Sequence, residues 1–270
     1  MIKKIIHIGD LHFKTYKRHQ EFREQFQKLF DFISELRKDY SYDEIRIAIC
    51  GDIVDQKINV SNELTLILAW FFNEVTKHCP VVMIAGNHDF LENNKDRVDS
   101  LTPVIQLLSK ENLFYLKESK CMVDDNIVWC PYSMFEDNKR PDIENYKDEF
   151  GKTKKLIGLY HGPLFGSTTD LGFAVEGHEL SIFEDLDYVL CADIHKRQVL
   201  KYNNIPIVYC GSYLQLNYGE TINKHGFLLW DVESGTYEEH DVESDYGYYQ
   251  FKIESLYDIE EGKEELTNEN

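Results

Sequence analysis

The sequence of 270 residues is short of proline, of paired cysteines and of long apolar runs. It has 6 prolines and 6 cysteines, with no Cys-x-x-Cys pair and no regular cysteine spacing. No apolar run approaches the roughly 20 residues needed to cross a bilayer. The short apolar N-terminus has no small-residue cleavage signal, so it is interpreted as a strand and not as a signal peptide. We therefore expect a cytoplasmic protein without membrane contact, whose cysteines are buried free thiols.

The chain is also short of positive charge. It carries 29 Lys and Arg against 48 Asp and Glu, a formal net charge of −19, and much of the acidity lies in residues 238–245 and 254–269. A nucleic-acid-binding protein usually carries a basic face. Contact with phosphate would therefore need bound cations or a partner that reverses the local field. The 43% hydrophobic content is typical of a globular protein with a substantial core.

The first half alternates strand-like and helix-like segments. Residues 3–8, 45–50 and 81–85 are apolar runs that predict buried strands. Helical periodicity predicts three helices: residues 20–38, a second helix that Ser61 could cap and that runs to about Lys77, and residues 101–109. A short strand is predicted at residues 114–116. This order predicts a mostly parallel sheet with helices on its faces. Ligands bind at the carboxyl ends of such strands.

The second half is predicted to consist of strands joined by short turns. The strands are predicted at residues 120–123, 127–131, 155–160, 188–191, 198–202, 205–210, 226–231 and 236–241. Hairpin turns are predicted at residues 124–126, 202–204 and 233–235. We expect these strands to form a second sheet packed on the first.

Polar side chains follow five of the predicted strands. They are Asp10, His12, Asp52, Asn87, His88, His161, Asp193 and His195. Carboxylates, imidazoles and an amide oxygen are the ligands of manganese, iron or zinc. The set is too large for one ion and suits a pair about 3.5–4 Å apart, an arrangement that hydrolyses phosphate esters. An imidazole that is not a ligand can protonate the leaving oxygen. Among the other histidines, His7 is expected to be a satisfied core residue and His178 a surface residue.

Five motifs carry a resemblance to a known family. They are Asp10-Leu11-His12, Gly51-Asp52-Ile53-Val54-Asp55, Gly86-Asn87-His88-Asp89, His161-Gly162 and Asp193-Ile194-His195. In this order they resemble the calcineurin-like metallophosphoesterase superfamily. The resemblance implies an α/β fold, a four-layer αββα sandwich of two mixed sheets flanked by helices.

Within the superfamily the chain resembles the SbcD-type repair nucleases, bacterial and phage relatives of the Mre subunit of the Mre–Rad complex. Gly9-Asp10-Leu11-His12 lies at the extreme N-terminus, as in that family, and Asp193-Ile194-His195-Lys196-Arg197-Gln198 resembles its Gly-His-Ile-His-Lys segment. Tyr209-Cys210-Gly211-Ser212-Tyr213-Leu214-Gln215, with Gly219-Glu220 and Lys224-His225-Gly226-Phe227, is similar to the end of its nuclease domain. The resemblance covers residues 1–242 as a nuclease domain. Residues 243–270 would be an acidic extension and the start of a capping region.

The resemblance also implies a role for each site residue. Asp10, His12 and His195 would hold one ion, Asn87 and His161 the other, and Asp52 would bridge both. His88 would protonate the leaving 3′ oxygen or orient the phosphate. Asp193 stands where the family usually has a histidine, so we expect a ligand with altered metal preference, or else a weakened second site. Lys196 and Arg197 are expected to contact phosphate. Asp55 and Asp89 are expected to hold the ligand residues in place without binding the ions themselves.

The implied function is that of a DNA nuclease. We expect two divalent ions, Mn²⁺ first and Mg²⁺, Fe²⁺ or Zn²⁺ as alternatives, with single-strand endonuclease and 3′-to-5′ exonuclease activity in repair or recombination of double-strand breaks. The partners would be DNA, an SbcC- or Rad-type ATPase with a coiled coil, and a second copy bound through residues 64–72 or 101–108, in a bacterial cell or a phage-infected host. Two alternatives stay open: a phosphatase or cyclic-nucleotide phosphodiesterase on the same site, and an inactive scaffold with a decayed site.

Overall fold

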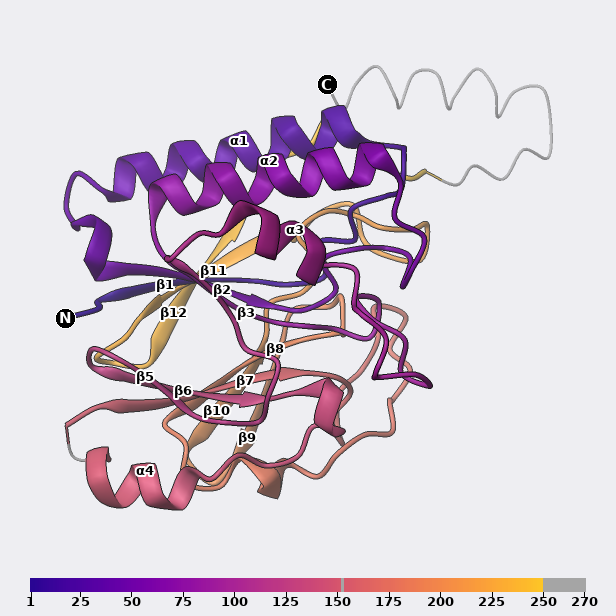
Figure 1. Cartoon of the computed structure of the whole chain (residues 1–270). Helices are drawn as coiled ribbons and strands as arrows, with labels where there is room; N and C mark the ends of the chain where they lie inside the picture. Colours follow the sequence, from indigo (N-terminus) through magenta and orange to yellow (C-terminus); the bar gives the residue numbers. More distant parts are fainter. Residues whose placement is uncertain (152, 250–270) are drawn as a thin grey trace, which may run out of the picture.

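Two six-stranded sheets pack face to face in the computed structural model, which describes residues 1–151 and 153–249. Helices α1 (His19–Leu36), α2 (Asn62–His78) and α3 (Thr102–Leu108) cover the outer face of the first sheet, and α4 (Ile143–Phe150) lies against the second (Figure 1). This arrangement confirms the predicted αββα sandwich of two mixed sheets.

The first sheet has the order β12-β11-β1-β2-β3-β4. Its strands are β1 (Lys4–Ile8), β2 (Ile45–Cys50), β3 (Val81–Ile84), β4 (Leu113–Tyr115), β11 (Gly226–Asp231) and β12 (Thr236–Asp241). Strands β1 to β4 are parallel, as predicted. The assignment of β11 and β12 to the second sheet was wrong, because β11 pairs antiparallel with β1, with Lys4 opposite Asp231. This pairing fills the other edge of β1 and buries five of the six residues of β11.

The second sheet has the order β5-β6-β7-β8-β10-β9. Its strands are β5 (Met122–Asp124), β6 (Ile127–Tyr132), β7 (Lys155–His161), β8 (Tyr188–Ala192), β9 (Gln198–Tyr202) and β10 (Ile205–Tyr209). All three predicted hairpin turns are present, and Asp125, Asn203 and Gly235 take the positive φ angles that tight turns require.

Three of the four α-helices were predicted from the sequence. The hydroxyl of Ser61 accepts a hydrogen bond from the backbone N–H of Leu64 at 3.0 Å, so Ser61 caps α2 as predicted. Helix α4 was not predicted, because it is only eight residues long, four of them are charged, and only Ile143 is buried. Three short 3₁₀ helices complete the described part: η1 (Tyr42–Glu44), η2 (Met134–Glu136) and η3 (Leu180–Phe183).

The interface between the sheets is apolar and holds a buried histidine. Trp129 and Trp230 are fully buried there, and all six cysteines are buried free thiols, as predicted. His7 is a core residue, but neither of its ring nitrogens has a hydrogen-bond partner, so the expectation of a satisfied histidine was wrong. Burial lowers the pKa of His7 to about 3, and the nearby Cys191 backbone offsets only part of this effect.

The described end of the chain contacts α1. Lys28 donates a hydrogen bond to the carbonyl of Glu243, and the Tyr246 hydroxyl donates to Glu24 at 2.9 Å. The predicted extension from 243 to 270 lies mostly outside the described residues, which end at 249. Among the described residues, no helix combines the length and apolar character that a membrane span requires.

Candidate metal centre

The site residues lie at the ends of strands of both sheets or on the loops that follow them, and these loops gather at one end of the sandwich (Figure 1). The backbone turns sharply at this end. Asp10, His12, Asp52 and Asp193 all have positive φ angles, from 47° to 95°. Residues other than glycine seldom adopt this region, and asparagine, aspartate and histidine do so more often than the rest. Four such residues at one end of the sandwich, all predicted metal ligands, fit a functional site, where sparsely populated backbone conformations cluster.

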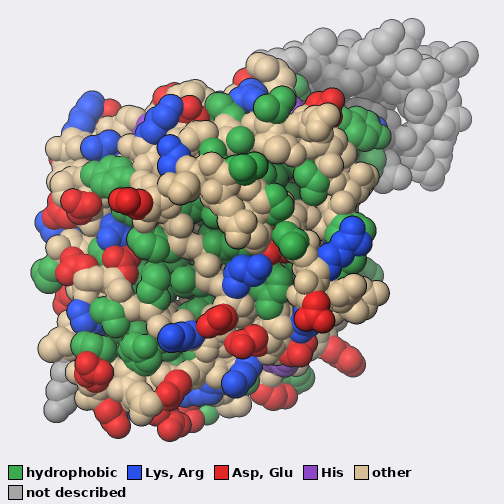
Figure 2. Space-filling view, viewed as in Figure 1, with side chains coloured by type: hydrophobic (Ala, Val, Ile, Leu, Met, Phe, Trp, Pro, Cys, Tyr) green, Lys and Arg blue, Asp and Glu red, His purple; other side chains and the backbone are tan. Residues whose placement is uncertain are grey.

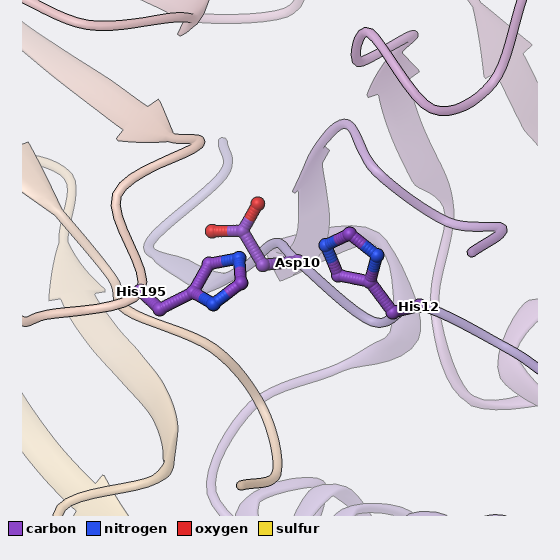
Figure 3. A group of neighbouring side chains, drawn as sticks. All are labelled: Asp10, His12 and His195. Atoms are coloured by element: carbon purple, nitrogen blue, oxygen red, sulfur yellow. The ribbon is translucent and has the colours of Figure 1, made fainter. Parts of the chain in front are cut away.

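One group of three side chains brings together residues that are distant in the sequence. Asp10 and His12 follow β1, and His195 follows β8 (Figure 3). The Asp10 carboxylate stands between the two imidazoles, and the ligand atoms of all three lie within 4.8 Å of one another. The backbone N–H of Asp193 donates to both Asp10 oxygens at 3.1 Å, which fixes the carboxylate.

Asp52 lies between this group and a second one. Its Oδ2 is 3.4 Å from Nε2 of His12, and its Oδ1 is 3.3 Å from Nε2 of His161. Asp52 also belongs to both other groups that could hold an ion, Asp10–Asp52–His161 and His12–Asp52–His88. One carboxylate that faces two ligand sets is the arrangement expected of a bridge between two ions.

The second group surrounds His161, which is fully buried. Its Nε2 is 3.0 Å from Oδ1 of Asn87 and 3.6 Å from Oδ1 of Asp193, and its Nδ1 is 2.7 Å from the carbonyl of Cys50. A backbone carbonyl on the far nitrogen sets the tautomer that leaves Nε2 for a metal. Asp193 therefore lies where it can serve as a ligand, although its role as one stays a prediction.

A glycine allows this close approach. A Cβ atom on Gly86 would lie 2.2 Å from Oδ1 of Asp52 and 2.6 Å from Cε1 of His161. Any side chain at position 86 would displace the proposed bridge. The glycine of Gly86-Asn87-His88-Asp89 is thus explained by the geometry of the cluster.

The electrostatics of the cluster fit divalent cations. Burial, together with Asp52 and Asp193, raises the pKa of Asp10 to about 7. Burial alone would lower the pKa of His161, but Asp52, Asp193 and Asp10 outweigh it and raise that pKa well above its usual value. Nε2 of His12 is buried and has no hydrogen-bond partner. Buried carboxylates, an unpartnered imidazole nitrogen and an amide oxygen form a donor set that bound cations would satisfy.

His88 lies at the mouth of the cluster and is half-buried. Its backbone N–H donates to Oδ1 of Asp52 at 2.8 Å, and its Nδ1 is 2.7 Å from the carbonyl of Asp55. The ring also meets that of His12 edge to face, with centroids 4.8 Å apart. His88 is therefore oriented by Asp55, and its Nε2 is the ring atom available to the cavity.

Asp89 supports the loops and does not contact His88 through its carboxylate. Its Oδ1 accepts from the backbone N–H groups of Ile53 and Val54 at 2.9 Å, and its Oδ2 accepts from Gly86 at 2.8 Å. One buried carboxylate therefore ties the loop after β2 to the loop after β3. Asp55 lies on the outer side, with its Oδ1 3.6 Å from Nδ1 of His12.

The two basic residues after His195 differ. The Arg197 side chain is 6% exposed and binds the carbonyls of Cys210 and His240 and the carboxylate of Asp241. The structure therefore gives Arg197 a role in attaching β12, in place of the expected phosphate contact. Lys196 donates to the hydroxyl of Thr168 at 3.2 Å and stays the candidate for a phosphate contact.

Two residues near the site had no role in the sequence prediction. Glu220 is buried, and its Oε1 is 2.8 Å from Nδ1 of His195. Asn217, together with His12, Lys14, His88 and other site residues, lines an open cavity of about 320 Å³ over the cluster. The signal for Glu220 was present, because Gly219-Glu220 formed part of the resemblance, but sequence alone assigned it no partner.

Comparisons with known proteins find relatives that match most of this chain. Uncharacterized protein R555 of Acanthamoeba polyphaga mimivirus is 35% identical over 259 residues, which are 93% of this chain but only 19% of that protein. A protein of Staphylococcus epidermidis that is named as a subunit of the nuclease SbcCD is 22% identical, over 86% of this chain and 66% of that protein. The chain thus spans less than two thirds of each of these relatives.

A solved structure and a family profile complete the comparison. The structure described as GAP50, the anchor in the inner membrane complex of Plasmodium, has a TM-score of 0.50 with 12% identity, over 90% of this chain and 89% of that one, which is a likeness of fold. The profile described as Calcineurin-like phosphoesterase matches residues 3–197. That range contains every predicted metal ligand, and the chain belongs to the calcineurin-like phosphoesterase family.

Proposed function

We propose that the chain is a DNA phosphodiesterase that binds two divalent ions on either side of Asp52, with Mn²⁺ as the first candidate. The observation that carries the proposal is the position of Asp52, which faces Nε2 of both His12 and His161 at 3.4 and 3.3 Å. Because the ligands on both sides are present, the site supports an active enzyme better than a decayed scaffold. When bound, the ions would activate the attacking water and hold the phosphate oxygens.

Other residues of the chain would supply positive charge, a proton donor and contacts that orient the ligand rings. Lys14 lines the cavity and pairs with Asp55 at 2.5 Å, so a positive charge lies near the incoming phosphate. The contact between His88 and the Asp55 carbonyl leaves Nε2 of His88 to donate a proton to the leaving oxygen. Glu220 and the Cys50 carbonyl hold the rings of His195 and His161 in their ligand orientations.

We further propose that the chain acts as the nuclease subunit of an SbcCD-like complex, with single-strand endonuclease and 3′-to-5′ exonuclease activity. The name of the Staphylococcus epidermidis relative supports this proposal. On the face shown in Figure 2, acidic and basic side chains of the described residues are intermingled and form no continuous basic stripe. With a net charge of −19, the chain would depend on a DNA-contacting ATPase partner.

The same proposal includes a homodimer formed through α2 and α3. Leu66 on α2 is 68% exposed and Leu107 on α3 is 83% exposed. Two large apolar side chains on neighbouring helices favour burial against a second copy.

The decisive experiment compares substrates. The purified chain with Mn²⁺ would be offered end-labelled single-stranded DNA, bis-p-nitrophenyl phosphate and a phosphomonoester. We expect cleavage of the DNA and the diester, and products from 3′- and 5′-labelled strands give the polarity. Turnover of the monoester without DNA cleavage would instead support a phosphatase. The Asp52→Asn variant is the control for a contaminating nuclease.

A further inference from the structure

A hairpin between β7 and η3 stands beside the metal centre. The backbone N–H of Phe165 donates to the carbonyl of His178 at 2.9 Å, and the N–H of Thr169 donates to the carbonyl of Phe173 at 3.0 Å. The tip of this hairpin carries two exposed apolar side chains: Leu171 is 70% exposed and Phe173 is 66% exposed. Such exposure at the tip of a hydrogen-bonded hairpin suggests a contact surface.

The hairpin is attached to the segment that carries His195. The side-chain amide of Gln198 accepts from the backbone N–H of Thr168 at 2.9 Å and donates to the Thr168 carbonyl at 2.9 Å. Lys196 donates to the hydroxyl of the same threonine. Because these three bonds connect residue 168 to residues 196 and 198, the position of the tip is fixed relative to His195.

A second open cavity, of about 320 Å³, lies under the tip. Leu171 and Phe173 of the hairpin line it, together with Ile194 and Glu220. Asp193, His195 and Asn217 line both this cavity and the one over the metal cluster. The two cavities therefore share a wall, and a group in the second one would adjoin a phosphate held at the cluster.

The lining selects for a neutral, flat group. Phe173, Leu171 and Ile194 offer apolar surface, and an aromatic ring can stack on a base. Asp170 and Glu220 place two acidic side chains in the same cavity. A second phosphate would be repelled there, whereas the π-face and polar edge of a nucleobase would be accepted.

We infer that this cavity binds the nucleobase next to the scissile phosphate, an inference that rests on the proposed phosphodiesterase function. A base must leave the double-helical stack to enter it, so the subsite makes unpaired nucleotides the preferred substrate. Phe173 is the residue on which the base stacks, and Leu171 adds apolar surface to the same cavity.

Two diester substrates that differ in the nucleoside test the inference. Both release p-nitrophenol: the p-nitrophenyl ester of thymidine 5′-phosphate and methyl p-nitrophenyl phosphate. The Leu171→Ala/Phe173→Ala variant should lower kcat/KM for the thymidine ester about ten- to hundredfold and leave the methyl ester unchanged. The matched control is Phe165→Ala, because Phe165 is 61% exposed on the same hairpin but does not line the cavity. Equal losses on both esters, or none, would overturn the subsite.

A binding measurement separates this inference from the proposed function. The Phe173→Trp variant places a fluorophore at the cavity, and titration with thymidine should quench its emission in a saturable way, with the unsubstituted chain subtracted as background. If the chain hydrolyses neither diester but thymidine still quenches, the proposed function fails and the subsite stands. If the diesters are hydrolysed and thymidine does not quench, the subsite is refuted.

Discussion

Oε1 of Glu220 lies 2.8 Å from Nδ1 of His195, and this contact leaves the other ring nitrogen, Nε2, for the metal cluster. The same carboxylate accepts from the backbone N–H of Leu216 at 2.8 Å and from the side chain of Asn217 at 2.6 Å. Burial alone would lower the pKa of His195, but Glu220 and Asp10 raise it to about 9. The Glu220 carboxylate therefore fixes the orientation of the His195 ring.

Glu220→Gln should weaken metal binding while leaving the fold intact. Loss of a carboxylate partner behind a ligating histidine typically costs about 10- to 100-fold in metal affinity. Titration calorimetry with Mn²⁺ measures the change. Glu144→Gln, on the exposed face of α4, is the matched control. An unchanged dissociation constant for Glu220→Gln would contradict this role.

His88→Ala should abolish most of the activity and retain both ions. Removing a general acid costs about 10²- to 10⁴-fold in rate. His88 also lies within reach of the His12–Asp52 group, so metal content measured beside kcat decides between acid and ligand. His178→Ala is the control, since His178 is exposed and its Nδ1 bonds Tyr160 at 2.9 Å. Loss of one ion per chain in His88→Ala would make His88 a ligand.

Asp193→Asn should weaken one of the two ions and spare the other. The backbone N–H of Asp193 would still hold Asp10, whereas the charge 3.6 Å from Nε2 of His161 would be lost. Asp193→His, the residue type of the resembling family, should bind two ions with a preference shifted from Mn²⁺ toward Zn²⁺. Metal analysis after dialysis at graded concentrations tests both variants. Two ions of unaltered affinity in Asp193→Asn would exclude it as a ligand.

His7 should make the protein less stable as the pH falls below 6.5. Its pKa is about 3 in the folded protein, against 6.5 for an ordinary histidine. Between these values the unfolded chain binds a proton that the folded chain does not, so stability is lost as the pH falls and is unaffected above 6.5. At pH 5.5 the loss is about 1.4 kcal/mol.

Urea unfolding at pH 7.5 and 5.5 measures this loss. The comparison is with His7→Leu, which keeps an apolar side chain of similar size in the core. The difference in unfolding free energy between the two pH values should be smaller in the variant by about 1.4 kcal/mol. Equal differences would show that His7 does not titrate as its burial implies.

Sequence reasoning located most strands and predicted the polar side chains that lie together at the candidate metal centre, because both depend on local patterns. Apolar runs that end in Asp, Asn or His mark the carboxyl end of a strand, and the bounds of β2, β9, β11 and β12 match the predictions. Partners distant in sequence were not predictable in the same way. The bond from Arg197 to Asp241 and the three bonds to Asp89 depend on how loops meet in space, which no spacing in the chain encodes.

The pairing of β1 with β11 has a consequence for folding during synthesis. Residues 4 and 231 are neighbours, so β1 has one open edge until almost all of the described chain has left the ribosome. Contacts of such long sequence separation form slowly because a large loop must close first. We therefore expect Asp10 and His12, although they precede the other predicted ligands in the sequence, to reach their final positions among the last.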